Sequence, residues 1–290
     1  MKMSGKPGTL ERKDVQRRFA RAARQFESAD FVHRYAAAGL FERLLPMQLD
    51  AARVLDLGCA VGRDRKSLGK RFPGALVIGL DNSRAMLRRA DRKRAWYSSP
   101  AFVQADAALL PLGDGSIDVV YANLLLPWVD DLRSCFTEIA RVLRKDGAFV
   151  FSTLGPNSFA ELRNAWAGTD PDRHVRNFPD MHDVGDTLVA CGLRDPVLDV
   201  DLLRLQYHDI DRLFADLRRT AAGNSLRDRD RGLTGKNRFR ALRKRIAGAT
   251  PEQAITVTLE LVYGHAWGAG SPSGKGEHRI AAAGIGRRRH

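Results

Sequence analysis

The chain has 290 residues, of which 44% are hydrophobic, so it is long enough for one large domain with an ordinary buried core. No apolar run approaches the roughly 20 residues that a membrane-spanning helix needs, and the charged start does not look like a secretion signal. The three cysteines, Cys59, Cys135 and Cys191, are too far apart for a disulfide framework or a zinc-ligand spacing. We therefore expect a cytoplasmic protein without a bound metal or a membrane anchor.

The net charge of +14 lies outside the middle of the chain. Residues 31–200 hold 22 basic and 21 acidic side chains, whereas residues 201–250 hold 13 and 6. Residues 1–30 and 271–290 each carry a net charge of +4. Such segments are either solvated helix faces or a docking surface for an acidic partner.

The first half of the chain predicts a helical cap followed by an α/β core. Residues 1–13 are expected to be disordered, and residues 14–45 to form an N-terminal cap of two helices, 14–26 and 29–45. Residues 53–153 then alternate between short apolar runs and helical patterns, which is typical of βαβ units with a parallel sheet. The predicted strands are 53–56, 76–80, 101–105, 117–122 and 148–153, and the predicted helices are 63–71, 83–94 and 132–144.

The second half has a mixed pattern, and we expect residues 154–253 to lie on the substrate side of one domain that spans 14–267. Its predicted elements are helices at 157–170, 183–191 and 209–221, one or two strands in 196–207, a loop at 223–238 and a final strand at 254–263. From 268 to 290 glycine, serine and arginine dominate, which predicts a flexible basic tail.

A loop of small residues follows the first predicted strand, within residues 54–62. Gly58 and Gly62 allow a sharp turn and let a ligand approach the main chain without a Cβ in the way. Between them stands Ala60, whose side chain the loop tolerates if its φ is negative. A strand, a loop of this kind and a helix together indicate a nucleotide-binding α/β domain.

Acids end the first three predicted strands. Asp56, Asp81 and Asp106 are 25 residues apart, about the length of one βα unit, so all three should meet at the carboxyl edge of the sheet. A carboxylate there accepts hydrogen bonds from both hydroxyls of a ribose. With the glycine loop, this pattern resembles the class I S-adenosylmethionine-dependent methyltransferases. The resemblance implies a Rossmann-like α/β fold whose sheet is largely parallel with an antiparallel last strand, with helical N-terminal and inserted cap segments.

The same resemblance implies a site for S-adenosylmethionine. In that family the loop contacts the amino-acid part of the cofactor, the second acid holds the ribose and the third reads the adenine. The cofactor-binding residues implied are Asp56, Gly58, Ala60, Gly62, Asp81, Asn82, Asp106, Ala107 and Asn123. Amide and adenine N-methyltransferases carry Asn-Pro-Pro-aromatic after the fourth strand; here Pro127 is displaced from the asparagine, so we exclude that class. Trp128 is expected to line the pocket.

Later segments resemble a narrower family, the malonyl-acyl-carrier-protein O-methyltransferases of biotin synthesis. The similarity spans about residues 12–267, and its more specific stretches include Gly155-Pro156-Asn157 and Gly232-Leu233-Thr234-Gly235. The segments that carry it are 123–132, 151–166, 178–186, 223–224, 232–235 and 262–267. The chain departs from the family pattern at Ala60, usually glycine, and at Phe26, often tyrosine. The resemblance implies an acidic carrier protein, or malonyl coenzyme A, as the delivery form of the substrate.

The reaction of that family suits the residues of this chain. A malonyl carboxylate ionises near pH ~4, so it is already a nucleophile at neutral pH and needs no general base. Catalysis would then consist of placement, with an arginine holding the oxygen that does not attack. Arg163, in a family-like segment, is our first candidate for this arginine and Arg218 is the second. Trp128 is the other residue that we expect to place the substrate.

Two other functions fit part of the sequence. A nucleic-acid methyltransferase would use the positive charge, although the basic stretches lack the interleaved aromatic residues that stack on bases. A cofactor-binding assembly factor that modifies protein arginines would share the fold. The Gly-Pro-Asn and Gly-Leu-Thr-Gly stretches favour the malonyl enzyme, and we do not expect a nucleic-acid partner.

Overall fold

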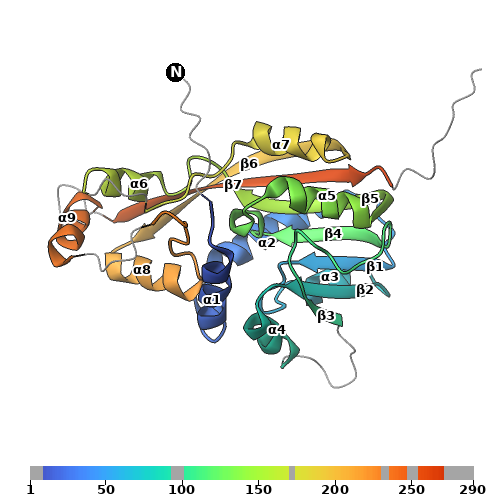
Figure 1. The fold of residues 1–290 in the computed structure, drawn as a ribbon, viewed down its shortest axis with the longest axis horizontal. Coiled ribbons are helices and arrows are strands. Elements are labelled where there is room, and N and C mark those ends of the chain that lie inside the picture. The colour runs from blue at the N-terminus through green and yellow to red at the C-terminus, as the bar shows by residue number, and fades with distance from the viewer. Residues whose placement is uncertain (1–8, 93–100, 170–173, 230–234, 247–253, 271–290) are drawn as a thin grey trace, which may run out of the picture.

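The computed structural model describes residues 9–92, 101–169, 174–229, 235–246 and 254–270. Within these residues, a seven-stranded sheet with the order β3-β2-β1-β4-β5-β7-β6 runs through the molecule (Figure 1). The strands are β1 (Arg53–Leu57), β2 (Leu76–Asp81), β3 (Ala101–Gln104), β4 (Ile117–Asn123), β5 (Leu143–Leu154), β6 (Leu193–Tyr207) and β7 (Ile255–Gly268). The first five are parallel, whereas β7 pairs antiparallel with both β5 and β6, which confirms the expected fold class.

Helices cover both faces of the parallel part. On one face α5 (Leu132–Val142) and α7 (Met181–Ala190) bury side chains such as Phe136 and Leu188 against the sheet. On the other face α2 (Phe31–Leu44) and α3 (Arg65–Arg71) bury Leu40 and Leu68. The short α4 (Arg84–Asp91) follows β2 and precedes β3 along the chain. Helices cover both faces of these apolar strands. The alternation of apolar runs and helical patterns in the sequence was therefore sufficient to predict this part of the fold.

The last two strands extend beyond the sheet. β5 pairs with β7 only from Ala148↔Trp267 to Leu154↔Leu261, so residues 202–207 and 255–260 continue as a two-stranded projection, which we call the arm. The arm carries α6 (Ala160–Ala167), α8 (Ile210–Arg219) and α9 (Lys236–Ile246), which lie at one end of the molecule (Figure 1). Their shared core includes Trp166, Tyr207, Leu213, Leu242 and Val257.

Two predictions for this region were wrong. The predicted loop 223–238 overlaps the start of α9, whose apolar face is only Phe239, Leu242 and Ile246 among many basic residues. The predicted end of the last strand at 263 is too early, because β7 continues to Gly268 along β5. Gly264 makes this continuation possible, since a Cβ there would lie 2.4 Å from the ring of Phe151.

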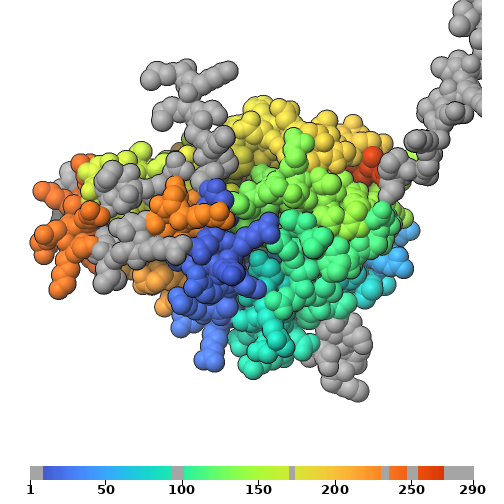
Figure 2. All heavy atoms as spheres, in the orientation of Figure 1, coloured from blue at the N-terminus to red at the C-terminus, as the bar shows by residue number. Residues whose placement is uncertain are grey.

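The N-terminal helix α1 (Arg12–Ala22) lies between the arm and the parallel strands (Figures 1 and 2). It ends four residues earlier than the predicted 14–26, and a single 3₁₀ turn, Phe26–Ser28, leads into α2. Leu10 forms an isolated bridge with Leu226, so the chain before α1 is tied to the segment after α8. Asp14 strengthens this tie through an ion pair with Arg229 at 3.1 Å.

Some expectations concern residues outside those described, namely 1–8, 232–234 of the Gly-Leu-Thr-Gly stretch and 271–290. Residues 9–13 of the segment 1–13, which we expected to be disordered, are described. Leu10 forms the bridge with Leu226, and residues 12–13 begin α1. None of the helices in the described ranges is long and apolar enough to cross a membrane.

Candidate active site

The loop after β1 has a left-handed backbone at three alternate positions. The φ angles of Gly58, Ala60 and Gly62 are 76°, 46° and 66°, so Ala60 does not have the negative φ at which the loop would tolerate its side chain without strain. A Cβ in this region costs about 1–2 kcal/mol. The Ala60 N–H compensates by donating to Oδ2 of Asp81 at 3.0 Å. The N–H of Gly58 donates to the carbonyl of Leu80 at 2.7 Å, which holds the loop against the end of β2.

The first predicted acid is buried behind this loop. Asp56, in β1, is 4% exposed. Burial, and then the nearby carboxylates of Asp64 and Asp81, raises the pKa of Asp56 well above its usual range. Its carboxyl is therefore placed to support the loop from within.

The other two acids are less buried than Asp56. Asp81 accepts the N–H of Ser83 at 2.8 Å as well as that of Ala60, yet burial outweighs these bonds and raises the pKa of Asp81 to about 6. Asp106 pairs with the guanidinium of Arg12 in α1 at 3.1 Å. Both partners of that pair are well exposed, so the contact contributes little stability and can open.

A polar cluster that the sequence did not suggest lies beneath the loop. Oδ2 of Asp64 accepts hydrogen bonds from the Tyr121 hydroxyl at 3.0 Å and from Nδ2 of Asn123 at 3.1 Å. The same Nδ2 donates to the carbonyl of His33 at 2.9 Å, which joins α2 to β4. The only sequence signal was the position of Asp64, two residues after Gly62, since the partners are distant along the chain.

A cavity of about 80 Å³ lies beside the loop, and we call it the loop cavity. Of the residues predicted to bind the cofactor, those that line it are Gly58, Ala60, Asp81, Asn82, Asp106, Ala107 and Asn123. Asp56 and Gly62 are not among its lining residues. Arg12, Val15 and Phe19 of α1 close its outer side.

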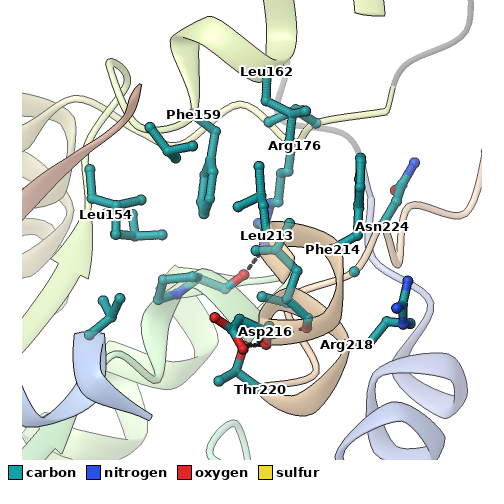
Figure 3. A pocket seen from close by; sticks show the side chains of 18 of the residues that line it. Leu154, Phe159, Leu162, Arg176, Leu213, Phe214, Asp216, Arg218, Thr220 and Asn224 are labelled. Atoms are coloured by element: carbon teal, nitrogen blue, oxygen red, sulfur yellow. Dashed lines mark hydrogen bonds between the residues drawn. The ribbon is translucent and has the colours of Figure 1, made fainter. Parts of the chain in front are cut away.

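A larger cavity of about 290 Å³, the arm cavity, lies between the parallel strands and the arm. Its walls are mostly aliphatic and aromatic side chains, several of which Figure 3 shows converging from different elements. They include Phe159 and Leu162 from the α6 region, Leu213 and Phe214 from α8, and Leu259 from β7. Such a cavity favours an apolar ligand with few polar groups.

The two cavities share three lining residues, His33, Leu124 and Trp128. Nδ1 of His33 is buried without a hydrogen-bond partner, and burial, then the charge of Arg63, lowers the pKa of His33 to about 4. The imidazole is therefore neutral at neutral pH. Phe19 of α1 packs edge-on against Trp128 with ring centroids 5.2 Å apart.

The arginine candidates occupy different places. Arg163 donates to the carbonyls of Pro156 at 3.3 Å and Ser158 at 2.9 Å and is not among the residues that line either cavity. Arg218 lies at the edge of the arm cavity and is exposed (Figure 3). A third arginine, Arg176, which the sequence did not single out, lies in the wall of the arm cavity (Figure 3).

Comparisons with known proteins agree with this geometry. A methyltransferase-domain family profile matches residues 55–151, from β1 to β5. The malonyl-acyl-carrier-protein O-methyltransferase of Gallionella capsiferriformans is 36% identical over 89% of this chain and 91% of its own. That of Halorhodospira halophila is 37% identical over 98% and 99%. The chain belongs to the malonyl-acyl-carrier-protein O-methyltransferase family.

Solved structures of other proteins share the fold at low identity. The YcgJ protein of Bacillus subtilis aligns with a TM-score of 0.59 at 20% identity, over 81% of this chain and 98% of its own. A methyltransferase-like protein of Bacillus halodurans aligns with a TM-score of 0.58 at 15% identity, over 80% and 97%. These neighbours support the architecture of the sheet and its helices.

S-adenosylmethionine is the methyl donor of this O-methyltransferase, and the loop cavity has the chemistry to hold it. Asp81 and Asp106 provide carboxylate acceptors, and Gly58 and Ala60 of the loop also line the cavity. The unpartnered Nδ1 of His33 offers one more polar contact on the wall toward the arm cavity. In the described part of the chain, no group of His, Cys, Asp or Glu side chains could hold a metal ion.

Proposed function

We propose that this protein transfers the methyl group of S-adenosylmethionine to the free carboxylate of a malonyl thioester on acyl carrier protein, a step that enters biotin synthesis. The observation that carries the proposal is the wall of His33, Leu124 and Trp128, which is common to the cavity that Asp81 and Asp106 line and to the largely apolar cavity under the arm. A donor on one side and an acyl group on the other would meet at this wall.

The residues of the loop cavity would hold the donor in distinct ways. Asp81 would accept from the ribose hydroxyls, Asp106 from the adenine amine once Arg12 withdraws, and the main chain at Gly58 and Ala60 would contact the amino-acid end. When bound, S-adenosylmethionine supplies a methyl group on a positively charged sulfur.

No general base is required on the acyl side. The carboxylate is ionised at neutral pH, so the protein has to bring its oxygen into line and exclude water. The apolar walls of the arm cavity and α1 over the loop cavity would exclude that water. His33, neutral at this pH, would add no competing positive charge to the shared wall.

The basic helix α9 supports a carrier protein rather than coenzyme A as the delivery form. Leu242 of α9 packs into the core of the arm, while Lys236, Arg240 and Lys244 are exposed. An acidic carrier protein would dock on such a face and reach the arm cavity with its flexible prosthetic arm. We place the reaction in the cytoplasm, where the free Cys59, Cys135 and Cys191 stay reduced.

The decisive experiment mixes the protein, S-adenosylmethionine and malonyl carrier protein and follows the carrier by mass spectrometry. We expect the mass of one added methylene, removed by mild ester hydrolysis. Acetyl carrier protein, which lacks the free carboxylate, is the matched control substrate and should stay unchanged. Malonyl coenzyme A tests the delivery form. Absence of methylation on both malonyl substrates would refute the function.

A further inference from the structure

Arg176 is a partly buried cation without a carboxylate partner among the described residues. Its Nη1 donates to the carbonyl of Pro127, and its Nη2 donates to that of Val129 at 3.2 Å. Its Nε is buried and unbonded. A guanidinium has five N–H groups, so donors remain for a ligand. Figure 3 shows the side chain descending between Phe159 and Leu213 into the arm cavity.

The surroundings of this guanidinium do not neutralise it. Burial lowers the pKa of Arg176, and Asp130 opposes the shift through space, but among the described residues no carboxylate forms an ion pair with Arg176. The neighbouring lining residues Phe159, Leu162 and Leu213 are apolar. A positive charge that is partly removed from water without an ion-pair partner lowers the stability of the protein unless an anion binds to it.

The position of the guanidinium is set by the segment it binds. Pro127 and Val129 flank Trp128, which lines both cavities. The two carbonyls therefore fix Arg176 on the arm-cavity side of the shared wall, next to the place where donor and acyl group would meet. Arg218, in contrast, is exposed at the edge of the same cavity.

We propose that Arg176 is the anion site of the arm cavity and binds the free carboxylate of the acyl substrate, leaving one of its oxygens turned toward the wall of His33, Leu124 and Trp128. This inference rests on the proposed function and adds the residue that recognises the substrate. A guanidinium suits the role because its planar N–H groups fix the orientation of the bound oxygen as well as supplying charge. The same guanidinium explains how an otherwise apolar cavity would select a dicarboxylic acyl group.

The test measures binding without turnover. The protein is saturated with S-adenosylhomocysteine, and its dissociation constants for malonyl and acetyl carrier protein are compared. Because these ligands differ by one carboxylate, we expect the wild type to prefer malonyl by about a hundredfold, the scale of a buried charged hydrogen bond. In Arg176→Met the preference should disappear while the affinity for acetyl carrier protein stays within a factor of three, on the order of ordinary surface changes.

Three further substitutions separate recognition of the carboxylate from a structural role of the arginine. Arg71→Met removes another arginine that donates to two carbonyls, those of Leu44 and Met47, away from both cavities, and should keep the malonyl preference. Arg163→Met tests the competing candidate and should keep it as well. Arg176→Lys retains the charge without the fork and should give a preference between those of the wild type and Arg176→Met.

The outcomes are distinct. A malonyl preference that survives in Arg176→Met, that is lost in Arg163→Met instead, or that is absent from the wild type overturns the anion site. If Arg176→Met does not bind S-adenosylhomocysteine, Arg176→Lys decides, and an undiminished preference there overturns it. Methylation of malonyl carrier protein by the wild type is measured separately. The proposed function fails if no methyl ester forms, even where Arg176 binds the carboxylate.

Discussion

Ala60 shows how a single residue can depart from a family pattern and still serve the same loop. Its φ of 46° is a conformation that glycine adopts freely, and the hydrogen bond from its N–H to Asp81 keeps it there. The departure therefore changes the strain in the loop rather than its path. The neighbouring Asp81 carries the larger functional consequence, because its carboxylate both supports Ala60 and lines the loop cavity.

Replacing Ala60 with glycine should stabilise the protein. The substitution removes strain of about 1–2 kcal/mol, partly offset by the greater freedom of glycine in the unfolded chain, so we expect a net gain of about 0.5–1 kcal/mol. Urea unfolding measures it. Ala38→Gly, at an exposed position inside α2, is the control and should lose about 1 kcal/mol. Equal losses for both substitutions would contradict the strain at Ala60.

Cofactor affinity should depend on the protonation of Asp81. With a pKa of about 6, this carboxyl is largely protonated at pH 5 and ionised at pH 7.5. Because the carboxylate is the form that accepts from two hydroxyls, affinity should rise as the pH increases through 6, by at most about tenfold per pH unit below the pKa. Calorimetry with S-adenosylhomocysteine measures this. Asp81→Asn should bind more weakly and lose that part of the pH dependence; an unchanged profile would rule Asp81 out.

At the scale of elements, α1 covers the loop cavity. Its side chains Arg12, Val15 and Phe19 close the loop cavity, and Leu10 and Asp14 tie it to the segment after α8. The donor therefore has to pass a helix whose only ion pair with an acid of the loop cavity, among the described residues, is the exposed one between Arg12 and Asp106. We interpret α1 as a cover whose packing controls how long the cofactor stays.

Phe19→Ala should speed the release of the cofactor. The substitution removes the aromatic contact with Trp128, a loss of about 1.4 kcal/mol of packing, which corresponds to a dissociation rate about tenfold higher. Stopped-flow displacement of S-adenosylhomocysteine measures the rate. Phe41→Ala, which removes a ring stacked on Tyr121 at 5.5 Å outside the loop cavity, serves as the control. Equal release from both variants would argue against a covering role of α1.

At the scale of the whole molecule, the excess positive charge lies outside the segment that forms the parallel strands. Residues 31–200, which include the parallel strands, are nearly neutral, whereas the basic excess gathers in segments such as α9 at the end of the arm. The arm also provides much of the apolar cavity, so a partner attracted to α9 would be near its entrance. Steering by complementary charge speeds association and weakens with salt.

Reversing the charge of α9 should raise the KM for malonyl carrier protein more than the KM for malonyl coenzyme A. The triple substitution Lys236→Glu, Arg240→Glu and Lys244→Glu should raise the KM for malonyl carrier protein at least tenfold at low salt, because the carrier is acidic. The KM for malonyl coenzyme A, which has no protein surface to dock, should change much less. Lys66→Glu with Lys70→Glu, on exposed positions of α3, is the matched control. Equal effects of both sets would exclude α9 as the docking face.

The parallel part of the fold and most of the loop cavity could be predicted because their signals are local. A strand, a glycine loop and an acid follow one another within a few residues, and parallel strands bring such acids to one edge whatever the rest of the chain does. Asp81 and Asp106 line the loop cavity for this reason. Asp56 does not line it, because its side chain turns into the interior at a position that spacing alone could not distinguish.

The choice among the arginines could not be made from the sequence. Arg163 lies in the more family-like segment, but its guanidinium binds the carbonyls of Pro156 and Ser158 near its own helix. Arg176 reaches the carbonyls of Pro127 and Val129, 49 and 47 residues away, and so enters the arm cavity. His33 reaches both cavities in the same long-range way.

The sequence by itself thus determined the parallel α/β core, the glycine loop, the order of the acids and the distribution of charge, since each depends on neighbours along the chain. Only the tertiary structure decided that α1 covers the loop cavity and that β6 and β7 project as an arm. It also decided that Arg176 stands at the wall between two cavities without a carboxylate partner among the described residues. These features depend on contacts between distant segments, and nothing in the local order of residues specifies which of many similar side chains will meet.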